Sequence, residues 1–275
     1  MENYYITTPI YYVNDKPHIG HAYTTVVADI LARYYRFKLG PEKVHFLTGT
    51  DEHGSKIAQS AEKNKQTPKQ FCDEVSELFK SSWHELNITF DDFIRTTDER
   101  HEVIVEEILG KLKQAKTPKG NDVIYKGTYE GLYCVGCESY KKEDDLVEGK
   151  CPDHNKAPEN LSEENWYFKL SDYEELLKEK IETKQIHILP EDKEKEVLSF
   201  IEQGLEDIAI SRANVEWGIP VPFDKDQTIY VWVDALINYI SALGFPEGEQ
   251  FEQFWPANVH LLAKDILKFH CIIWP

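Results

Sequence analysis

Positive charge is scarce in this sequence. Of its 275 residues, 31 are Lys or Arg and 49 are Asp or Glu, which gives a formal net charge of −18. This balance argues against a basic surface that binds nucleic acid anywhere, although it is compatible with a local basic groove. Glycine (14) and proline (13) are too few for a collagen-like or low-complexity chain, and 41% hydrophobic residues suffice for a sizeable core.

Long hydrophobic runs are also missing. No run approaches the ~20 apolar residues that span a bilayer, and the longest candidate, residues 229–237, is broken by Asp234. The first residues lack the positive and apolar regions of a signal peptide. The five cysteines are odd in number and unevenly placed for a disulfide framework. We therefore expect a cytoplasmic protein with reduced thiols and no membrane partner.

Short apolar runs alternate with helical stretches over about the first 115 residues, which is typical of the βαβ units of a parallel sheet. The expected strands are residues 4–8, 44–48 and 93–95, and the expected helices are residues 22–38, 55–65, 68–86 and 99–116. After a turn-rich break at 117–122, the chain becomes rich in Gly, Tyr and Cys, and two charged helices follow in 171–206. The βα pattern returns after 217–222, with a helix at 231–243.

The fold class predicted is therefore α/β, a Rossmann-like parallel sheet interrupted by an insertion of about 100 residues. Its expected parts are the first half of the sheet domain (1–116), the insertion (117–214) with a zinc knuckle (134–154), and the second half of the sheet domain (215–275).

The string His18-Ile19-Gly20-His21 lies between the first expected strand and the first long helix. Two imidazoles three residues apart at a helix N-terminus face the same way, where backbone N–H groups and the helix dipole favour an anion. Gly20 lets a phosphate approach the backbone closely. The pattern suits stabilisation of a polyphosphate under attack at its α-phosphorus. Two histidines that merely cap a loop are the alternative.

A second motif combines soft metal ligands. Cys134 and Cys137 form a C-x2-C knuckle, and Cys151 and His154 form a C-x2-H knuckle after a further thirteen residues. Paired knuckles in a short polar segment predict one tetrahedral zinc ion with all four positions filled by protein, and hence a structural site. Unligated surface thiols are the alternative.

Several residues beyond the two motifs are candidates for ligand contacts. Asp51 ends the second expected strand, where ligands of open α/β sheets bind, so it could hold an ammonium group or cap the next helix. Trp232 and Tyr239 mark one face of a helix, which alone predicts a core stripe. A strand followed by a helix is expected over 259–274, and residues 260–270 are interpreted as a late strand whose end delivers Lys264 and Asp265 to the same sheet edge.

In combination, these motifs resemble methionyl-tRNA synthetases, a family of class I aminoacyl-tRNA synthetases. The resemblance covers essentially the whole chain, and its motifs occur in the same order. They are residues 7–14, 18–21, 49–54, the knuckles of 134–154, 210–212, 217–222, 230–236, and 264–266 followed by His270.

The resemblance implies ATP-dependent activation of L-methionine to methionyl-adenylate, with Mg accompanying ATP, and transfer of methionine to tRNA(Met). It implies that His18 and His21 stabilise the ATP phosphates, with Gly20 beside them. Lys264 and Asp265 contact the nucleotide, and Asp265 faces the ribose.

The same resemblance implies a methionine site. Asp51 binds the ammonium group, supported by Arg212. The implied side-chain pocket consists of Ile10, Tyr12, Trp232, Ala235, Leu236, Tyr239, Ile266 and His270. A flexible thioether suits such an aromatic-rich pocket, which has few polar partners.

By resemblance, a Lys-Met-Ser-Lys-Ser loop and a helical anticodon-binding domain are expected beyond Pro275, so the chain is expected to be an N-terminal catalytic fragment with impaired activity. Synthetases for leucine, isoleucine or valine share the His-x-Gly-His pattern, but they need an editing domain that the short insertion cannot hold. A nucleotidylyltransferase and a non-catalytic zinc-stabilised interaction module are two further candidate functions.

Overall fold

The computed structural model describes residues 2–137, 139–141 and 143–275. Four parallel strands form the central sheet in the order β11-β1-β2-β3. They are β1 (Tyr4–Tyr12), β2 (Val44–Asp51), β3 (Asp92–Arg95) and β11 (Val259–His260). Every residue of β2 is buried, as expected for a strand covered on both faces. The predicted parallel α/β fold is confirmed.

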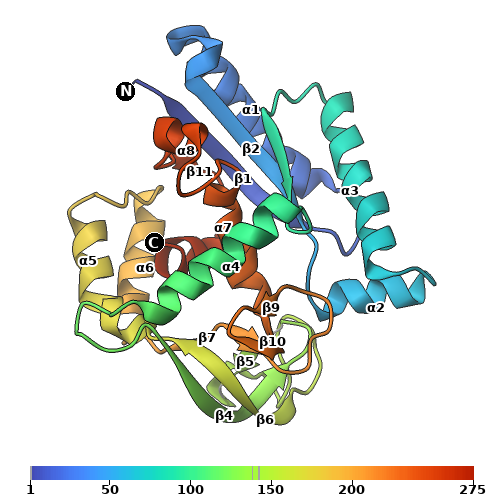
Figure 1. Cartoon of the computed structure of the whole chain (residues 1–275), viewed down its shortest axis with the longest axis vertical. Coiled ribbons are helices and arrows are strands. Elements are labelled where there is room, and N and C mark those ends of the chain that lie inside the picture. The colour runs from blue at the N-terminus through green and yellow to red at the C-terminus, as the bar shows by residue number, and fades with distance from the viewer. Residues whose placement is uncertain (1, 138, 142) are drawn as a thin grey trace.

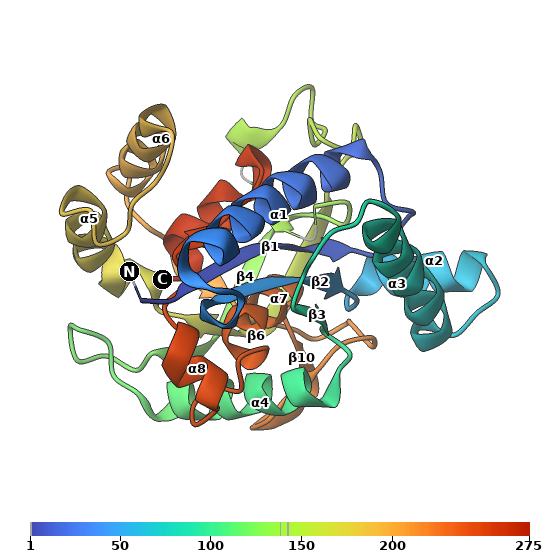
Figure 2. The same ribbon diagram turned by 90° about the horizontal axis from the view of Figure 1, so that it is seen from above.

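Helices cover both faces of this sheet. Figure 2 shows α1 (Ile19–Leu39) on one face, and α4 (Glu99–Gln114) and α8 (Glu249–Phe254) on the other. Helix α7 (Val231–Ser241) contacts both α4 and β1. Beyond the edge of β3 lie α2 (Ser55–Lys63) and α3 (Pro68–Glu85), at the right of Figure 1.

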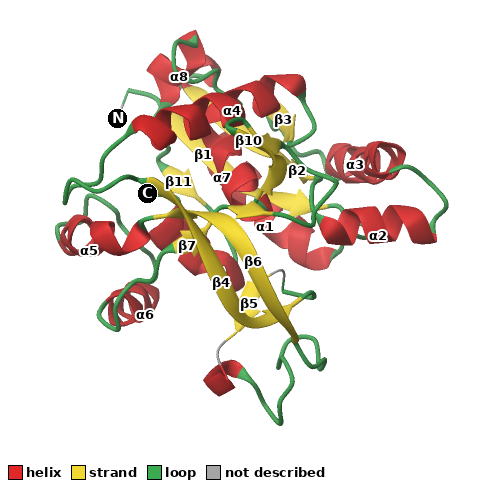
Figure 3. Ribbon diagram, turned by 60° about the horizontal axis from the view of Figure 1, so that its bottom comes forward, coloured by secondary structure: helices red, strands yellow, loops and turns green. Residues whose placement is uncertain are grey.

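A second sheet lies within residues 117–214. It is antiparallel, in the order β5-β4-β6-β7, and its two long strands project as a twisted ribbon (Figure 3). The strands are β4 (Ile124–Cys134), β5 (Ser139–Lys141), β6 (Glu159–Phe168) and β7 (Ile208–Ala209). The two charged helices predicted for 171–206 are α5 (Glu174–Glu182) and α6 (Glu191–Ile201).

A short antiparallel sheet connects this region to α7. Its order is β8-β10-β9, and its strands are β8 (Ser211–Arg212), β9 (Pro220–Val221) and β10 (Asp224–Ile229). No helix in the described part of the chain is long and apolar enough to cross a membrane.

The order expected over 259–274, a strand followed by a helix, is confirmed, but the strand is much shorter than the 260–270 expected for it. Strand β11 ends at His260, Lys264–Ile266 form a 3₁₀ turn, and Phe269–Ile273 form a π-helical turn. Apolar residues spread through 261–273 look like a buried strand in the sequence. In the structure they pack partly against α5 and α6, in a cluster that includes Leu267 and Ile272.

Candidate active site at the carboxyl edge of the parallel sheet

The first candidate group is the histidine pair at the start of α1. His18 is the N-cap residue, and its Nδ1 accepts a hydrogen bond from the Gly20 N–H at 3.1 Å. The His21 Nδ1 accepts one from the His18 N–H at 3.3 Å. The two rings stack with their centroids 3.7 Å apart. The structure therefore brings the two histidines together, as the spacing predicted.

These backbone hydrogen bonds determine where each neutral ring carries its proton. Because Nδ1 of both rings is an acceptor, Nε2 is the N–H donor in each. Partial burial and the neighbouring His18 lower the pKa of His21 to about 4, so this ring is neutral at pH 7. The pair thus offers two adjacent N–H donors at a helix N-terminus, an arrangement suited to phosphate oxygens.

Gly20 has a role that the sequence did not suggest. A Cβ at this position would lie 2.9 Å from Cε1 of His18, closer than real Cβ contacts. The glycine therefore makes room for the capping imidazole itself. The position of His18 depends on this missing side chain.

Asp51 ends β2, buried to 7% exposure. It lies opposite Tyr12 in the register of β1 and β2, so two residues of the implied methionine site share the carboxyl edge of the sheet. The N-cap of the following helix α2 is Gly54, which excludes the alternative that Asp51 caps that helix.

Helix α7 supplies four of the eight residues of the implied side-chain pocket. Leu236 and Tyr239 are buried in one apolar cluster, and Ile10 and Phe269 pack against it. Trp232 stacks on the Phe269 ring at a centroid distance of 3.9 Å. Ala235 is buried to 4% exposure on the same helix.

His270 connects α7 to the chain after β11. Its Nδ1–H donates to the Ile266 carbonyl at 3.0 Å, which leaves Nε2 to accept from the Tyr239 hydroxyl at 2.7 Å. Burial lowers the pKa of His270, so the neutral ring is favoured. The His270 imidazole is thus part of a polar link beside the implied pocket.

Arg212 and the nucleotide candidates lie apart from these groups. The Arg212 guanidinium donates to the Ser211 carbonyl at 2.8 Å and lies over the Tyr230 ring. It lines a small pocket with Gly54, the residue three positions after Asp51. Lys264 and Asp265 are exposed in their 3₁₀ turn, which leaves both side chains accessible at the surface.

The four metal-ligand candidates converge in the antiparallel sheet region. The ligand atoms of Cys134, Cys137, Cys151 and His154 all lie within 4.8 Å of one another. The Cys137 and Cys151 sulfurs are 3.5 Å apart, and the Cys137 sulfur is 3.3 Å from Nδ1 of His154. Zn–S bonds of about 2.3 Å and Zn–N bonds of about 2.0 Å put tetrahedral ligands at about this separation. The donor set and its spacing therefore fit a zinc ion.

Gly136 explains how the knuckle accommodates its histidine. A Cβ on Gly136 would lie 2.4 Å from Cγ of His154. The glycine inside the C-x2-C knuckle therefore leaves the space that this ring occupies.

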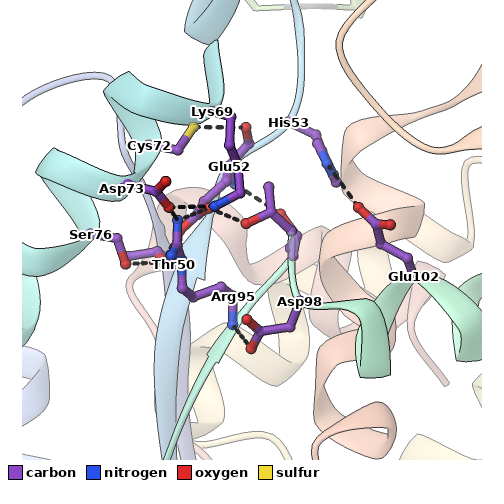
Figure 4. Close-up of polar contacts among 12 residues, drawn as sticks. Thr50, Glu52, His53, Lys69, Cys72, Asp73, Ser76, Arg95, Asp98 and Glu102 are labelled. Atoms are coloured by element: carbon purple, nitrogen blue, oxygen red, sulfur yellow. Dashed lines mark hydrogen bonds and ion pairs between the residues drawn. The ribbon is translucent and has the colours of Figure 1, made fainter. Parts of the chain in front are cut away.

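A buried carboxylate beside the site was missed in the sequence. Glu52 is fully buried, and Arg95 donates to both of its oxygens at 2.7 and 2.8 Å (Figure 4). The Thr50 and Thr97 hydroxyls also donate to it. Arg95 contacts Asp73 of α3 as well, so Arg95 of β3 is bonded both to α3 and to the residue that follows Asp51.

We expect Arg95→Leu to lower the free energy of unfolding by about 3–5 kcal/mol, because it leaves the Glu52 charge buried without its cation. Arg100→Leu is the matched control, since the Arg100–Asp92 pair is more exposed and such pairs contribute about 0–1 kcal/mol. Urea unfolding followed by circular dichroism measures both. Equal losses in the two variants would contradict this account of Glu52.

A known protein family matches this chain over most of its length. The model of the family described as class I tRNA synthetases (M) matches residues 4–160 and 153–275. The chain belongs to this family. This synthetase chain is 52% identical to the methionine–tRNA ligase of Streptomyces coelicolor and 49% identical to that of Thermotoga maritima, each over 99% of its length. It spans 51% and 43% of these relatives, about half of their length.

Solved structures agree with this assignment. The synthetase chain aligns over 100% of its length, at 38% identity and a TM-score of 0.92, with 54% of Mycobacterium tuberculosis methionyl-tRNA synthetase in complex with methionyl-adenylate. Against 52% of the free-state structure of that enzyme, the TM-score is 0.80 at 37% identity.

Proposed function

We propose that the chain is the catalytic part of a methionine–tRNA ligase, which activates L-methionine with ATP to methionyl-adenylate and transfers methionine to tRNA(Met) in the cytoplasm. The observation that carries the proposal is the gathering of the histidine pair and Asp51 at the carboxyl edge of the parallel sheet, with the apolar cluster of α7 packed on that sheet. The relatives named methionine–tRNA ligase support it.

In the proposed reaction, a carboxylate oxygen of methionine attacks the α-phosphorus of ATP, and the bond to pyrophosphate breaks. The Nε2–H groups of His18 and His21 donate to phosphate oxygens that gain charge in the transition state. Mg accompanies the ATP phosphates, and Lys264 and Asp265 contact the nucleotide.

The amino acid is held by separate groups. Asp51 accepts hydrogen bonds from the ammonium group, and Arg212 supports it. The pocket around Trp232, Tyr239 and His270 takes the thioether, together with Ile10, Tyr12, Ala235, Leu236 and Ile266. A polarizable sulfur gains from aromatic edges.

Titration of the chain with L-methionine, L-leucine and L-isoleucine in a calorimeter tests the assignment. We expect methionine to bind most tightly, because leucine lacks the sulfur contacts and its branch fits a linear slot poorly. Equal affinity for the three amino acids would contradict the methionine assignment.

Trp232→Phe should remove most of the change in tryptophan fluorescence on binding, since Trp232 packs at the pocket.

We also propose that residues 117–214 form an insertion domain between the two halves of the catalytic domain, residues 1–116 and 215–275. Within it, Cys134, Cys137, Cys151 and His154 hold one structural zinc ion.

Metal analysis should find one zinc ion per chain, and Cys151→Ser should release it. Because structural zinc contributes folding energy directly, chelation should lower the unfolding temperature of the insertion. Cys271→Ser is the matched control, since Cys271 is buried outside the cluster. An unchanged melting profile after complete chelation would contradict the zinc site.

A further inference from the structure

A buried carboxylate in α7 has no part in the reaction proposed above. Asp234 is exposed to only 1%, and it is the single charged residue between Ile229 and Leu243. Its Oδ2 lies 2.7 Å from Nδ1 of His53, and its Oδ1 lies 2.7 Å from Nε2 of His101. Both imidazoles are buried as well. A buried carboxylate stays ionised only where opposite charges or hydrogen-bond donors contact it.

The proton arrangement of this cluster follows from its contacts. A carboxylate only accepts, so His53 donates through Nδ1–H and His101 donates through Nε2–H. The other nitrogen of His101, Nδ1, lies 2.7 Å from the Ser241 hydroxyl. Burial alone would raise the pKa of Asp234, but the facing His53 and the hydrogen bonds from both imidazoles hold it below its usual value. Asp234 is therefore an anion that receives two N–H groups.

The three partners come from different elements. His53 lies in the segment just after β2, two residues beyond Asp51, and Figure 4 shows its ring directed towards Glu102 of α4. His101 lies in the first turns of α4. One carboxylate therefore joins α7 to α4 and to the segment that follows Asp51.

The same helix carries the proposed methionine pocket. Trp232 precedes Asp234 by two residues, and Ala235 follows it directly. Asp51, at the other end of this link, is the proposed ammonium ligand. We propose that Asp234 is a positioning residue that fixes the distance between the ammonium site and the side-chain pocket, and so selects the length of the amino-acid side chain. This inference rests on the proposed function and names a determinant of its specificity.

Asp234→Asn tests the link at nearly constant volume. The Asn amide has one oxygen acceptor and one NH2 donor. Its oxygen accepts a hydrogen bond from one imidazole, but its NH2 group faces the N–H of the other imidazole, and two donors repel each other. We expect the affinity for L-methionine to fall roughly tenfold, within the range of coupling between contacting groups. The affinities for L-norleucine and for L-ethionine, which is one methylene longer, should change by different factors, so that the preference for methionine over ethionine decreases.

The ratio between these amino acids separates positioning from a structural role. A variant that is merely less folded binds all three more weakly by the same factor and leaves the ratio unchanged. Asp172→Asn is the matched control, a buried carboxylate bonded to Thr117 and Asn121 in another part of the chain, and it should leave the ratio unchanged.

Two substitutions of His53, one of the residues bonded to Asp234, provide a second test of the proposal. His53→Asn places an amide N–H near the position of Nδ1 and should keep the preference for methionine, whereas His53→Ala should lose it. This pair decides the question even where Asp234→Asn does not fold. Calorimetric titration measures all affinities, and thermal unfolding monitors the fold. A wild-type chain that binds no methionine contradicts the proposed function. Selective wild-type binding with unchanged ratios in Asp234→Asn and His53→Ala contradicts the positioning role alone.

Discussion

Replacing His21 by Ala should slow methionine-dependent exchange of pyrophosphate into ATP by roughly 10²–10³-fold, while the affinity for methionine barely changes. The reason is that a preorganised donor to developing charge acts mainly in the transition state, and the loss of one such donor has this magnitude. The rate of pyrophosphate exchange measures the first effect, and calorimetry with methionine measures the second. His187→Ala, at an exposed histidine of the insertion, is the control.

The fixed tautomers make this prediction sharper. Because Nε2 is the free donor of each ring, His21→Gln, whose amide nitrogen reaches a similar position, should retain more activity than His21→Asn. The same order is expected at His18. Normal exchange in the Ala variants would remove the histidine pair from the mechanism, and a reversed order of Gln and Asn would contradict the assigned tautomers.

Asp51→Ala should weaken methionine binding by about 3–5 kcal/mol, or roughly 100–4,000-fold, because it leaves the ammonium group buried without its partner. Calorimetric titration of the chain measures this loss. Asp15→Asn is the control, since it removes one negative charge from an exposed loop near the same sheet edge. If both variants bind methionine equally well, Asp51 is not the ammonium ligand.

The sequence predicted those parts of the fold in which local pattern and tertiary role agree. Residues 44–48, with the apolar Val44, Phe46 and Leu47, predict a strand, and the structure extends this strand to Asp51. The spacing of the two Cys/His knuckles in the sequence is enough to predict that their four ligand atoms lie close together. The length of the strand that starts at Val259 was overestimated because the apolar residues after His260 pack against helices that are distant in sequence, and periodicity cannot reveal such a partner.

The parts of the site that were missed share one physical cause. Glu52 and Asp234 are charges whose partners lie far away in the chain, at Arg95 and at two histidines. The sequence does hold a signal for Asp234, since a lone carboxylate within an apolar helix must be paired or neutral. It holds none for the identity of the partners, which the packing of α4 and of the segment after β2 against α7 determines.

The pairing of β1 with β11 has a consequence for synthesis on the ribosome. Thr7 bonds to His260, a residue 253 positions later in the chain. At a synthesis rate of about 5–20 residues per second, the edge of β1 that pairs with β11 stays unpaired for roughly 10–50 s. An unpaired strand edge is a template for wrong pairing with other chains. The nascent polypeptide therefore has to keep this edge from aggregating until Val259 and His260 emerge, after the whole antiparallel ribbon between them has been made.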